Sequence, residues 1–196
     1  MNITEVVMSL EKYLNKVESK NFNEIRKMYL ENKETFTKPF LKTMDCMFQD
    51  IIRLQECGKK GKVAYISFSM LYSNLLLDKN SLRIDIYDSN YVCDDVEVVG
   101  EWTPEHIFDR CKDDMDKAMR ILSSDYIRVE PYEHRMLYQS YVADYYLLAV
   151  VILRDMLPMI KELKTYQHMQ KEEEVVVIYG EYMDKGEKIY SIVNEE

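Results

Sequence analysis

The chain has 196 residues, of which 47% are hydrophobic and 31% are charged. This length and composition exclude a disordered chain and predict one soluble globular domain over residues 1–196. The formal net charge of −9 disfavours binding to nucleic acid and to anionic membrane surfaces, because like charges repel. The same charge favours a protein partner with a basic surface, whose approach it accelerates.

Cysteine usage and the first residues predict a cytoplasmic protein. The four cysteines form no CxxC pair and have no spacing typical of a zinc site. The first segment, MNITEVVMSLEKYL, has no basic region followed by an apolar stretch, so we expect no signal peptide. We therefore expect reduced thiols and no cofactor. The cysteines are Cys46, Cys57, Cys93 and Cys111.

Apolar residues at helical spacing predict three helices before Gly58. The first covers residues 3–19. The second begins with Asn21 as its cap and stops before Pro39, because the residue before a proline resists helical geometry. Thr37 caps the third helix, which Gly58 ends.

Residues 63–77, VAYISFSMLYSNLLL, fit two structures. The stretch ISFSM alternates as a strand does, whereas the apolar residues of the whole segment also fit one face of a helix. Fifteen residues are long for a strand, which favours a helix. A helical N-terminal part over 1–78 follows from this interpretation.

Strand patterns appear in two pairs. LRIDIY alternates cleanly between apolar and polar residues, and the tail carries two apolar runs around a turn at 183–186. The expected strands cover 82–87, 96–99, 174–180 and 187–193. Thr103-Pro104-Glu105 is a strong helix start between the two pairs. The apolar run 141–153 is too short to cross a membrane and predicts the central helix of a bundle.

The element order predicts an α+β fold: a predominantly helical bundle with a small antiparallel β-sheet. Its expected parts are the helices of 1–78, a strand pair at 81–100, helices at 103–168 and a C-terminal hairpin at 174–193. An acidic helix face follows Thr103, and its interleaved basic residues indicate solvated ion pairs. The acids of that face are Asp109, Asp113, Asp114 and Asp116.

The most acidic stretch, RIDIYDSNYVCDDVE at 83–97, is one candidate site. No register of it matches a calcium-binding EF-hand loop, but a different divalent metal site remains an alternative. The other interpretation is a hairpin loop, because aspartate and asparagine are turn formers. The candidate metal ligands are Asp88, Asn90, Asp94 and Asp95.

Asp144 is the second candidate, since it lies within the most apolar helix and a buried carboxylate requires a partner or a proton. Tyr138, Tyr141 and Tyr145 form a stripe beside it. Together they predict either a ligand pocket or a purely structural polar network. Trp102, the single tryptophan, is a candidate contact for a partner or an anchor for the following helix.

The sequence contains no recognisable catalytic motif. It therefore predicts a small acidic protein-interaction module that is not an enzyme, of a regulatory, adaptor or antitoxin/immunity type. The alternative is a ligand-binding protein or enzyme with a pocket around Asp144 and the tyrosine stripe. The apolar strands also predict a possible homodimer paired through a sheet edge.

Overall fold

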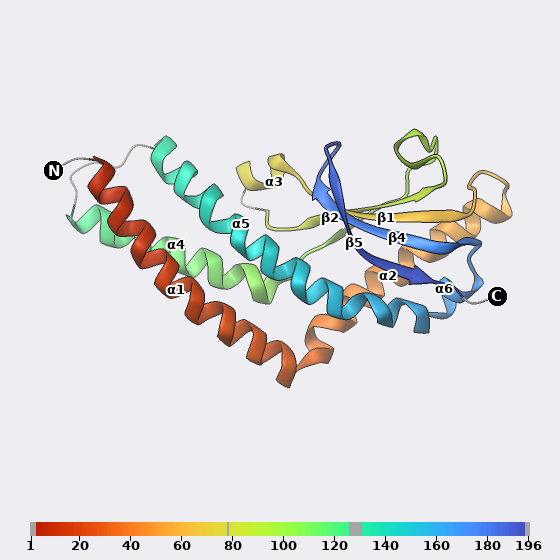
Figure 1. The fold of residues 1–196 in the computed structure, drawn as a ribbon, viewed down its shortest axis with the longest axis horizontal. Coiled ribbons are helices and arrows are strands. Elements are labelled where there is room, and N and C mark those ends of the chain that lie inside the picture. The colour runs from red at the N-terminus through yellow and green to blue at the C-terminus, as the bar shows by residue number, and fades with distance from the viewer. Residues whose placement is uncertain (1–2, 78, 126–130, 195–196) are drawn as a thin grey trace. The chain divides into compact units, whose positions relative to one another are not determined.

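The computed structural model describes residues 3–77, 79–125 and 131–194. The α-helices are α1 (Ile3–Glu31), α2 (Lys33–Glu56), α3 (Tyr72–Leu76), α4 (Glu105–Asp125), α5 (Pro131–Met156) and α6 (Lys164–His168). The 3-10 helices are η1 (Tyr91–Cys93) and η2 (Leu157–Glu162). The strands are β1 (Val63–Met70), β2 (Leu82–Asp88), β3 (Val99–Trp102), β4 (Lys171–Glu181) and β5 (Gly186–Val193). This mixed content confirms the predicted α+β class in its broad form (Figure 1).

The chain divides into two compact units, each built from two segments. The helical unit comprises Met1–Lys33 and Pro104–Val151, and the sheet unit comprises Glu34–Thr103 and Ile152–Glu196. The single domain expected over residues 1–196 stays a prediction. Among the described residues, no helix has the length and apolar character that a membrane crossing demands.

The helical unit packs α1, α4 and most of α5 around aromatic side chains. Phe22 of α1 meets Tyr145 of α5 edge to face, with ring centroids 5.1 Å apart. Phe108 of α4 lies 4.7 Å from Tyr146 of α5. Aromatic pairs at these separations add to the free energy gained from burial alone, so they fix the three helices in one register.

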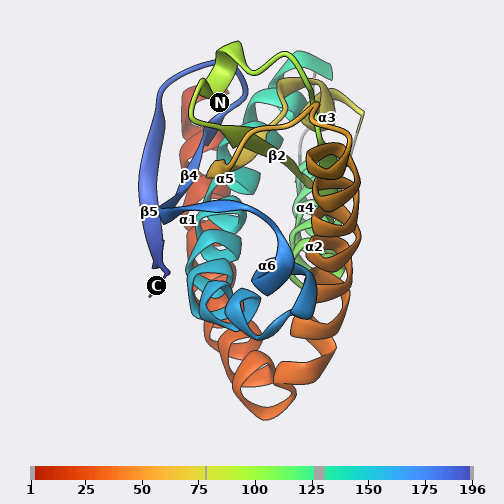
Figure 2. The same ribbon diagram turned by 90° about the vertical axis from the view of Figure 1, so that its right-hand side faces the viewer.

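The sheet has five strands in the order β3-β2-β1-β4-β5. β1 pairs in parallel with β4, and the remaining neighbours pair antiparallel. The sheet is therefore mixed, and the purely antiparallel sheet predicted from the sequence is wrong. β5 forms one edge, and Figure 2 shows it along the outer side of the sheet.

One face of the sheet carries the core. Phe68 of β1 lies 6.2 Å from Phe40 of α2, and Phe48 of α2 lies 5.4 Å from Tyr166 of α6. Figure 1 shows α2 running along this sheet. Because side chains alternate along a strand, the opposite face receives the polar set of β1 and β2. We call this opposite face the open face. Its residues from β1 and β2 are Tyr65, Ser67, Ser69, Arg83, Asp85 and Tyr87.

The helix predicted over 63–77 is wrong. Residues 63–70 form the central strand β1, and only 72–76 are helical. Apart from Ser67 and Ser69, residues 63–71 are apolar or aromatic, so the segment also fits a helix. No glycine or proline separates β1 from α3, which made the two elements look like one long segment.

Other boundaries also move. The strand expected at 96–99 lies instead at Val99–Trp102, where Trp102 pairs with Leu82. The two helices expected around Asn21 are one helix, α1, within which Asn21 is buried. Pro39 lies inside α2, in its second turn, so it did not end a helix. The strands predicted at 82–87, 174–180 and 187–193 are confirmed within a few residues as β2, β4 and β5.

Candidate functional site

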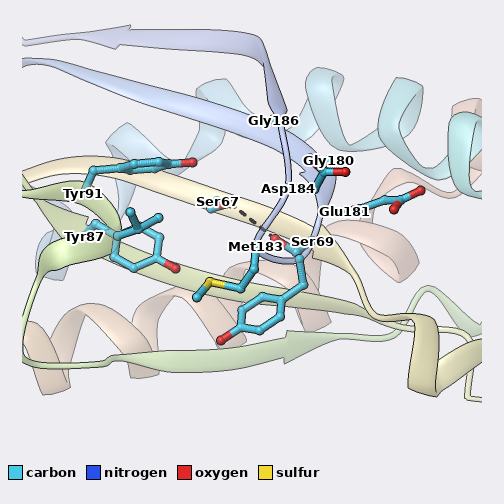
Figure 3. Close-up of a pocket in the computed structure, with 11 residues that line it drawn as sticks. Ser67, Ser69, Tyr87, Tyr91, Gly180, Glu181, Met183, Asp184 and Gly186 are labelled. Carbon is cyan, nitrogen blue, oxygen red and sulfur yellow. Dashed lines mark hydrogen bonds between the residues drawn. The ribbon is translucent and has the colours of Figure 1, made fainter.

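A pocket of about 270 Å³ lies on the open face of the sheet, and we call it the tyrosine pocket (Figure 3). Four segments surround it: β1, the end of β2 with η1, and the two sides of the β4–β5 turn. Figure 3 shows Tyr87 and Tyr91 on one side, with Gly180, Glu181 and Asp184 on the other. The lining residues are Ser67, Ser69, Tyr87, Tyr91, Val92, Gly180, Glu181, Tyr182, Met183, Asp184 and Gly186.

Two serines of β1 form the floor of the pocket. Ser67 and Ser69 are two residues apart on a strand, so both side chains lie on the same face. Their hydroxyl oxygens are 3.4 Å apart, and the residues are 7% and 5% exposed. A floor of small hydroxyl side chains leaves room above the strand and offers hydrogen-bond donors and acceptors to whatever enters.

Two tyrosines, Tyr87 and Tyr91, form one wall of the pocket, and Tyr65 packs against Tyr91. The ring of Tyr91 lies 5.0 Å from that of Tyr65 and 5.3 Å from that of Tyr87. Both contacts are edge-to-face, which favours a fixed arrangement of the rings. Burial, followed by the negative charge of Asp85, raises the pKa of Tyr87 to about 12. Its phenol therefore stays protonated at neutral pH and can donate a hydrogen bond.

The β4–β5 turn closes the opposite side of the pocket. Gly180 and Gly186 face each other at the base of the turn. A Cβ atom on Gly180 would lie 2.7 Å from the carbonyl oxygen of Lys185, so a side chain there would displace the turn. The glycine pair thus brings Tyr182 and Met183 over the sheet.

Two lining residues have strained backbones. Tyr91 has φ 55° and Met183 has φ 63°, and these are the positive-φ residues other than glycine in the described part of the chain. For such residues the left-handed region costs on the order of 1 kcal/mol, and such strain clusters at binding sites. Met183 and a second apolar lining residue, Val92, are also 73% and 54% exposed. Strain and exposed apolar surface therefore coincide at one place.

An ion pair of β2 supports the pocket from behind. The guanidinium of Arg83 donates to both carboxylate oxygens of Asp85, at 2.7 to 3.0 Å. The same guanidinium lies 4.4 Å above the ring of Tyr182, within the range of a cation–π contact. Asp85, which is 3% exposed, therefore positions Arg83, and Arg83 positions Tyr182.

The acidic loop of 83–97 presents Tyr91 and is held by a buried pair. Asp94 accepts hydrogen bonds from the backbone amides of Asp88 and Val96, at 2.8 and 3.1 Å, and from the ammonium of Lys60. Burial opposes ionisation of Asp94, but these bonds outweigh it and lower its pKa. The Lys60 ammonium also donates to the carbonyl oxygen of Ile86 at 2.9 Å. The loop is thereby fixed between β2 and β3.

Three of the four predicted metal ligands, Asp88, Asn90 and Asp94, make other hydrogen bonds. Asp88 accepts a bond from the backbone amide of Asn90 at 2.8 Å, as in an aspartate turn, and Asp95 is exposed. Lys60 places a positive charge beside Asp94, where a cation would have to sit. These contacts favour the hairpin-loop interpretation. In the described residues no group of three or more acidic, histidine or cysteine side chains is arranged for a metal ion.

A second hollow of about 230 Å³ adjoins the tyrosine pocket. It lies between the end of β1 and the β4–β5 turn, and it shares Glu181 and Tyr182 with the tyrosine pocket. Tyr72 lines it and is 62% exposed. The two hollows follow each other along the end of the sheet.

In the helical unit, the carboxylate that binds the tyrosine stripe is Asp114. Its Oδ2 accepts hydrogen bonds from the hydroxyls of Tyr141 and Tyr145, at 3.0 and 3.1 Å, and from the amide of Asn21. Asp114 is 3% exposed, contrary to the solvated position expected for it. Burial raises the pKa of both tyrosines.

Asp144 itself is half-buried rather than buried as the apolar sequence around it indicated. Its carboxylate lies near Glu18 of α1, and burial together with Asp144 raises the pKa of Glu18. Tyr138 is buried in the same helix. The structure brings Tyr141 and Tyr145 together, but their shared partner comes from α4.

Trp102 is 3% exposed and lies 5.6 Å from Phe40, ring to ring. It packs between the end of β3 and α2. The Trp102 side chain is therefore not accessible to a partner in this structure. Its packing favours the alternative interpretation, in which Trp102 is an anchor within the fold.

A scan against protein-family models, a search of curated proteins and a search of solved structures each return no match. Fold and site define an α+β protein with a mixed sheet and a tyrosine-lined hollow on its open face.

The sequence does not predict the pocket residues as a site, and the reason is physical. They come from four strands and the segments between them, and Ser67 and Ser69 lie in the segment whose predicted helix is wrong. The usable signal was the alternation Tyr65, Ser67, Ser69 opposite Arg83, Asp85 and Tyr87. When two strands each carry polar and aromatic residues on one face, that face of the sheet is expected to lie outside the hydrophobic core.

Proposed function

We propose that this protein is a non-catalytic interaction module that binds a segment of a partner protein in the tyrosine pocket. One observation carries the proposal. Both residues that hold a strained left-handed backbone in the described part of the chain, Tyr91 and Met183, line the same hollow. Strain persists where the surrounding structure enforces it, and it recurs at sites of recognition.

The size and chemistry of the pocket support a protein ligand. A volume of about 270 Å³ lies just below the range of roughly 300–1,000 Å³ for small-molecule and cofactor sites. It suits a single side chain of a larger partner. Tyrosine, serine and glycine dominate the lining, and these residues give large, rigid contact area together with adaptable hydrogen bonds.

The second hollow supports an extended segment rather than an isolated side chain. Because the two hollows share Glu181 and Tyr182, alternate side chains of one extended strand can occupy both. Alternate residues of an extended chain point the same way, with a spacing of about 6–7 Å. Tyr72 and Met183 then contact the segment at its two ends.

The role that fits such a module is regulatory, adaptor-like or of the antitoxin/immunity type. We place it in the cytoplasm, since Cys46, Cys57 and Cys93 are free and exposed, which suits a reducing compartment. Its acidity supports a protein partner over nucleic acid or an anionic membrane. The tyrosine stripe around Asp144 is a weaker alternative, because the hydroxyls of Tyr141 and Tyr145 are used by Asp114.

Photo-crosslinking tests the proposal. A benzophenone amino acid replaces Met183 at the pocket or, as a control, Leu30, which is 61% exposed on α1 of the helical unit. The full chain carrying either replacement is irradiated in a lysate of the producing cells. We expect one specific protein adduct from position 183, and none above background from position 30.

Two results contradict the proposal. Equal adducts at positions 183 and 30, or no adduct at 183, exclude a partner at the pocket. An adduct with twice the mass of the chain shows that a second copy occupies the pocket. The variant Tyr91→Leu in the position-183 protein removes one wall of the pocket, and we expect it to weaken the specific adduct at least several-fold.

A further inference from the structure

The charged side chains that line the tyrosine pocket are both acidic. Glu181 and Asp184 are exposed carboxylates that line its rim, and none of its eleven described lining residues is lysine or arginine. Arg83, the cation behind the wall, is neutralised by Asp85 and lies 3.8 Å from Glu97. An incoming positive group therefore meets favourable charge, in a chain whose net charge is −9.

The walls present aromatic rings. The face of a tyrosine ring attracts cations, and planar guanidinium groups also stack on it. The fold already contains one such contact: the Arg83 guanidinium lies 4.4 Å from the centroid of the Tyr182 ring. Tyr87 and Tyr91 form the facing wall of the same hollow.

Hydrogen-bond acceptors surround the same space. The hydroxyl oxygens of Ser67 and Ser69 lie at its floor, and the carboxylates of Glu181 and Asp184 lie at its rim. A guanidinium has five N–H donors in one plane and can serve several of these acceptors at once, whereas an ammonium is a compact point charge. This combination of flat walls and dispersed acceptors favours the guanidinium.

From these features we infer that the tyrosine pocket takes an arginine side chain of the partner protein. The inference rests on the proposed function and names the residue that the pocket recognises. The guanidinium lies against the rings of Tyr87 and Tyr91, above the two serine hydroxyls. The carboxylates of the rim set the preference for a positive charge.

A matched set of peptides tests the inference without knowledge of the partner. The probe is a fluorescein-labelled nine-residue peptide of alternating glycine and serine with one central arginine. Its controls replace that arginine by citrulline, which has the same shape without the charge, or by lysine. Fluorescence anisotropy with the full chain at low salt gives the dissociation constants. We expect the arginine peptide to bind at least tenfold more tightly than either control.

Variants locate the binding. Tyr91→Phe keeps the aromatic face and should retain the affinity, while Tyr91→Leu should weaken it about tenfold. The double variant Glu181→Gln and Asp184→Asn should weaken it several-fold. Glu173→Gln, an exposed acid on the same strand away from the pocket, should leave it unchanged. The amide spectrum of each variant shows whether the fold is kept.

Several outcomes overturn the inference. If the citrulline peptide binds as tightly as the arginine peptide, charge plays no role. If the lysine peptide binds as tightly as the arginine peptide, the pocket has no preference for a guanidinium. Binding that survives both Tyr91→Leu and the double acid variant places the peptide elsewhere. If a crosslinked partner forms at position 183 while the arginine peptide fails to bind, the proposed function stands and the arginine assignment is wrong.

Discussion

At the scale of single residues, the pair Lys60 and Asp94 holds the loop that carries Tyr91. Their side chains are 0% and 4% exposed, so each charge depends on the other for stabilisation. A buried pair contributes modestly as a whole, but removal of one partner leaves the other charge without compensation. The pocket wall therefore depends on a lysine that does not line the pocket.

The variant Lys60→Met tests this dependence. Methionine keeps the length and bulk of the side chain but removes the charge and its donors. We expect the free energy of unfolding to fall by about 3–5 kcal/mol, the usual cost of an orphaned buried charge. Urea denaturation measures the change, and the exposed neighbour variant Lys59→Met should change it by less than about 0.5 kcal/mol. Equal stabilities for the two variants would contradict the role of the pair.

Asp94 also predicts a dependence of stability on pH. Its hydrogen bonds lower its pKa in the folded state below the ordinary value of 3.8. The unfolded carboxyl therefore binds a proton at higher pH than the folded one does, so acid favours unfolding. The stabilisation is complete above pH 3.8 and is lost as the pH falls through the folded pKa.

The difference in unfolding free energy between the native chain and Asp94→Asn isolates this effect. We expect the difference to be constant near neutral pH and to shrink progressively below about pH 4. Guanidinium titrations at several pH values between neutral and strongly acidic provide the measurement. A difference that is independent of pH over that range would show that Asp94 does not titrate with a lowered pKa.

Asp114 makes a second residue-scale prediction, in the helical unit. Its replacement by alanine leaves the amide of Asn21 and the hydroxyls of Tyr141 and Tyr145 without their shared acceptor. We expect a loss of about 3–5 kcal/mol in unfolding free energy. The adjacent exposed variant Asp113→Ala should change it by less than about 0.5 kcal/mol. Similar effects of the two variants would contradict the central role of Asp114.

At the scale of elements, the β4–β5 turn holds Met183 in a left-handed backbone that lowers the stability of the fold. Met183→Gly relieves the left-handed strain and removes the side chain, while Met183→Ala removes the side chain and keeps the strain. We expect the glycine variant to be more stable than the alanine variant by about 1 kcal/mol in thermal or urea unfolding. Equal stabilities would show that the backbone of residue 183 is not strained.

Element by element, the sequence predicts well where local pattern and tertiary position agree. Strand β2 has one face in the core and one outside it, so its alternation is visible in the residues. Strand β1 also alternates, but the apolar residues of α3 follow it almost without a break, so the combined segment fits a helix as well. Asp114 looked solvated because basic residues surround it in sequence, whereas its partners come from α1 and α5.

The candidate site was predictable only in part for the same reason. The acidic stretch supplies Tyr87 and Tyr91 to the pocket, whereas the aspartates that drew attention to it hold the loop. Pocket geometry depends on which faces of β1, β2 and β4 meet, and that pairing leaves no local pattern. The left-handed backbones of Tyr91 and Met183 also cannot be predicted from the sequence, because tyrosine and methionine usually adopt negative φ.

At the scale of the whole molecule, acidity predicts how binding responds to salt. A net charge of −9 attracts a basic ligand over distances that salt screens. We expect the affinity of the arginine peptide to fall several-fold between 50 and 500 mM sodium chloride, with the citrulline peptide nearly unaffected. A matched salt series in fluorescence anisotropy measures both. Equal salt dependence of the two peptides would contradict an electrostatic contribution of the pocket.

Self-association stays a prediction and also belongs to this scale. The long edge strand β5 contains a bulge where its register with β4 shifts, and Lys188 pairs with Glu174 beside it. Bulges and edge charges discourage pairing between copies. Sedimentation velocity at micromolar concentration distinguishes the monomer that this edge favours from the homodimer that the apolar strands predict.

The parallel pairing of β1 with β4 constrains how the chain is made. The two central strands are separated by roughly 100 residues, which a ribosome adds in about 5–20 seconds. During that interval β1 has only β2 beside it, because β3 pairs with the far edge of β2, and the other edge of β1 waits for β4. The nascent chain therefore exposes one edge of β1 until β4 emerges, which is the period in which chaperones would most affect its yield.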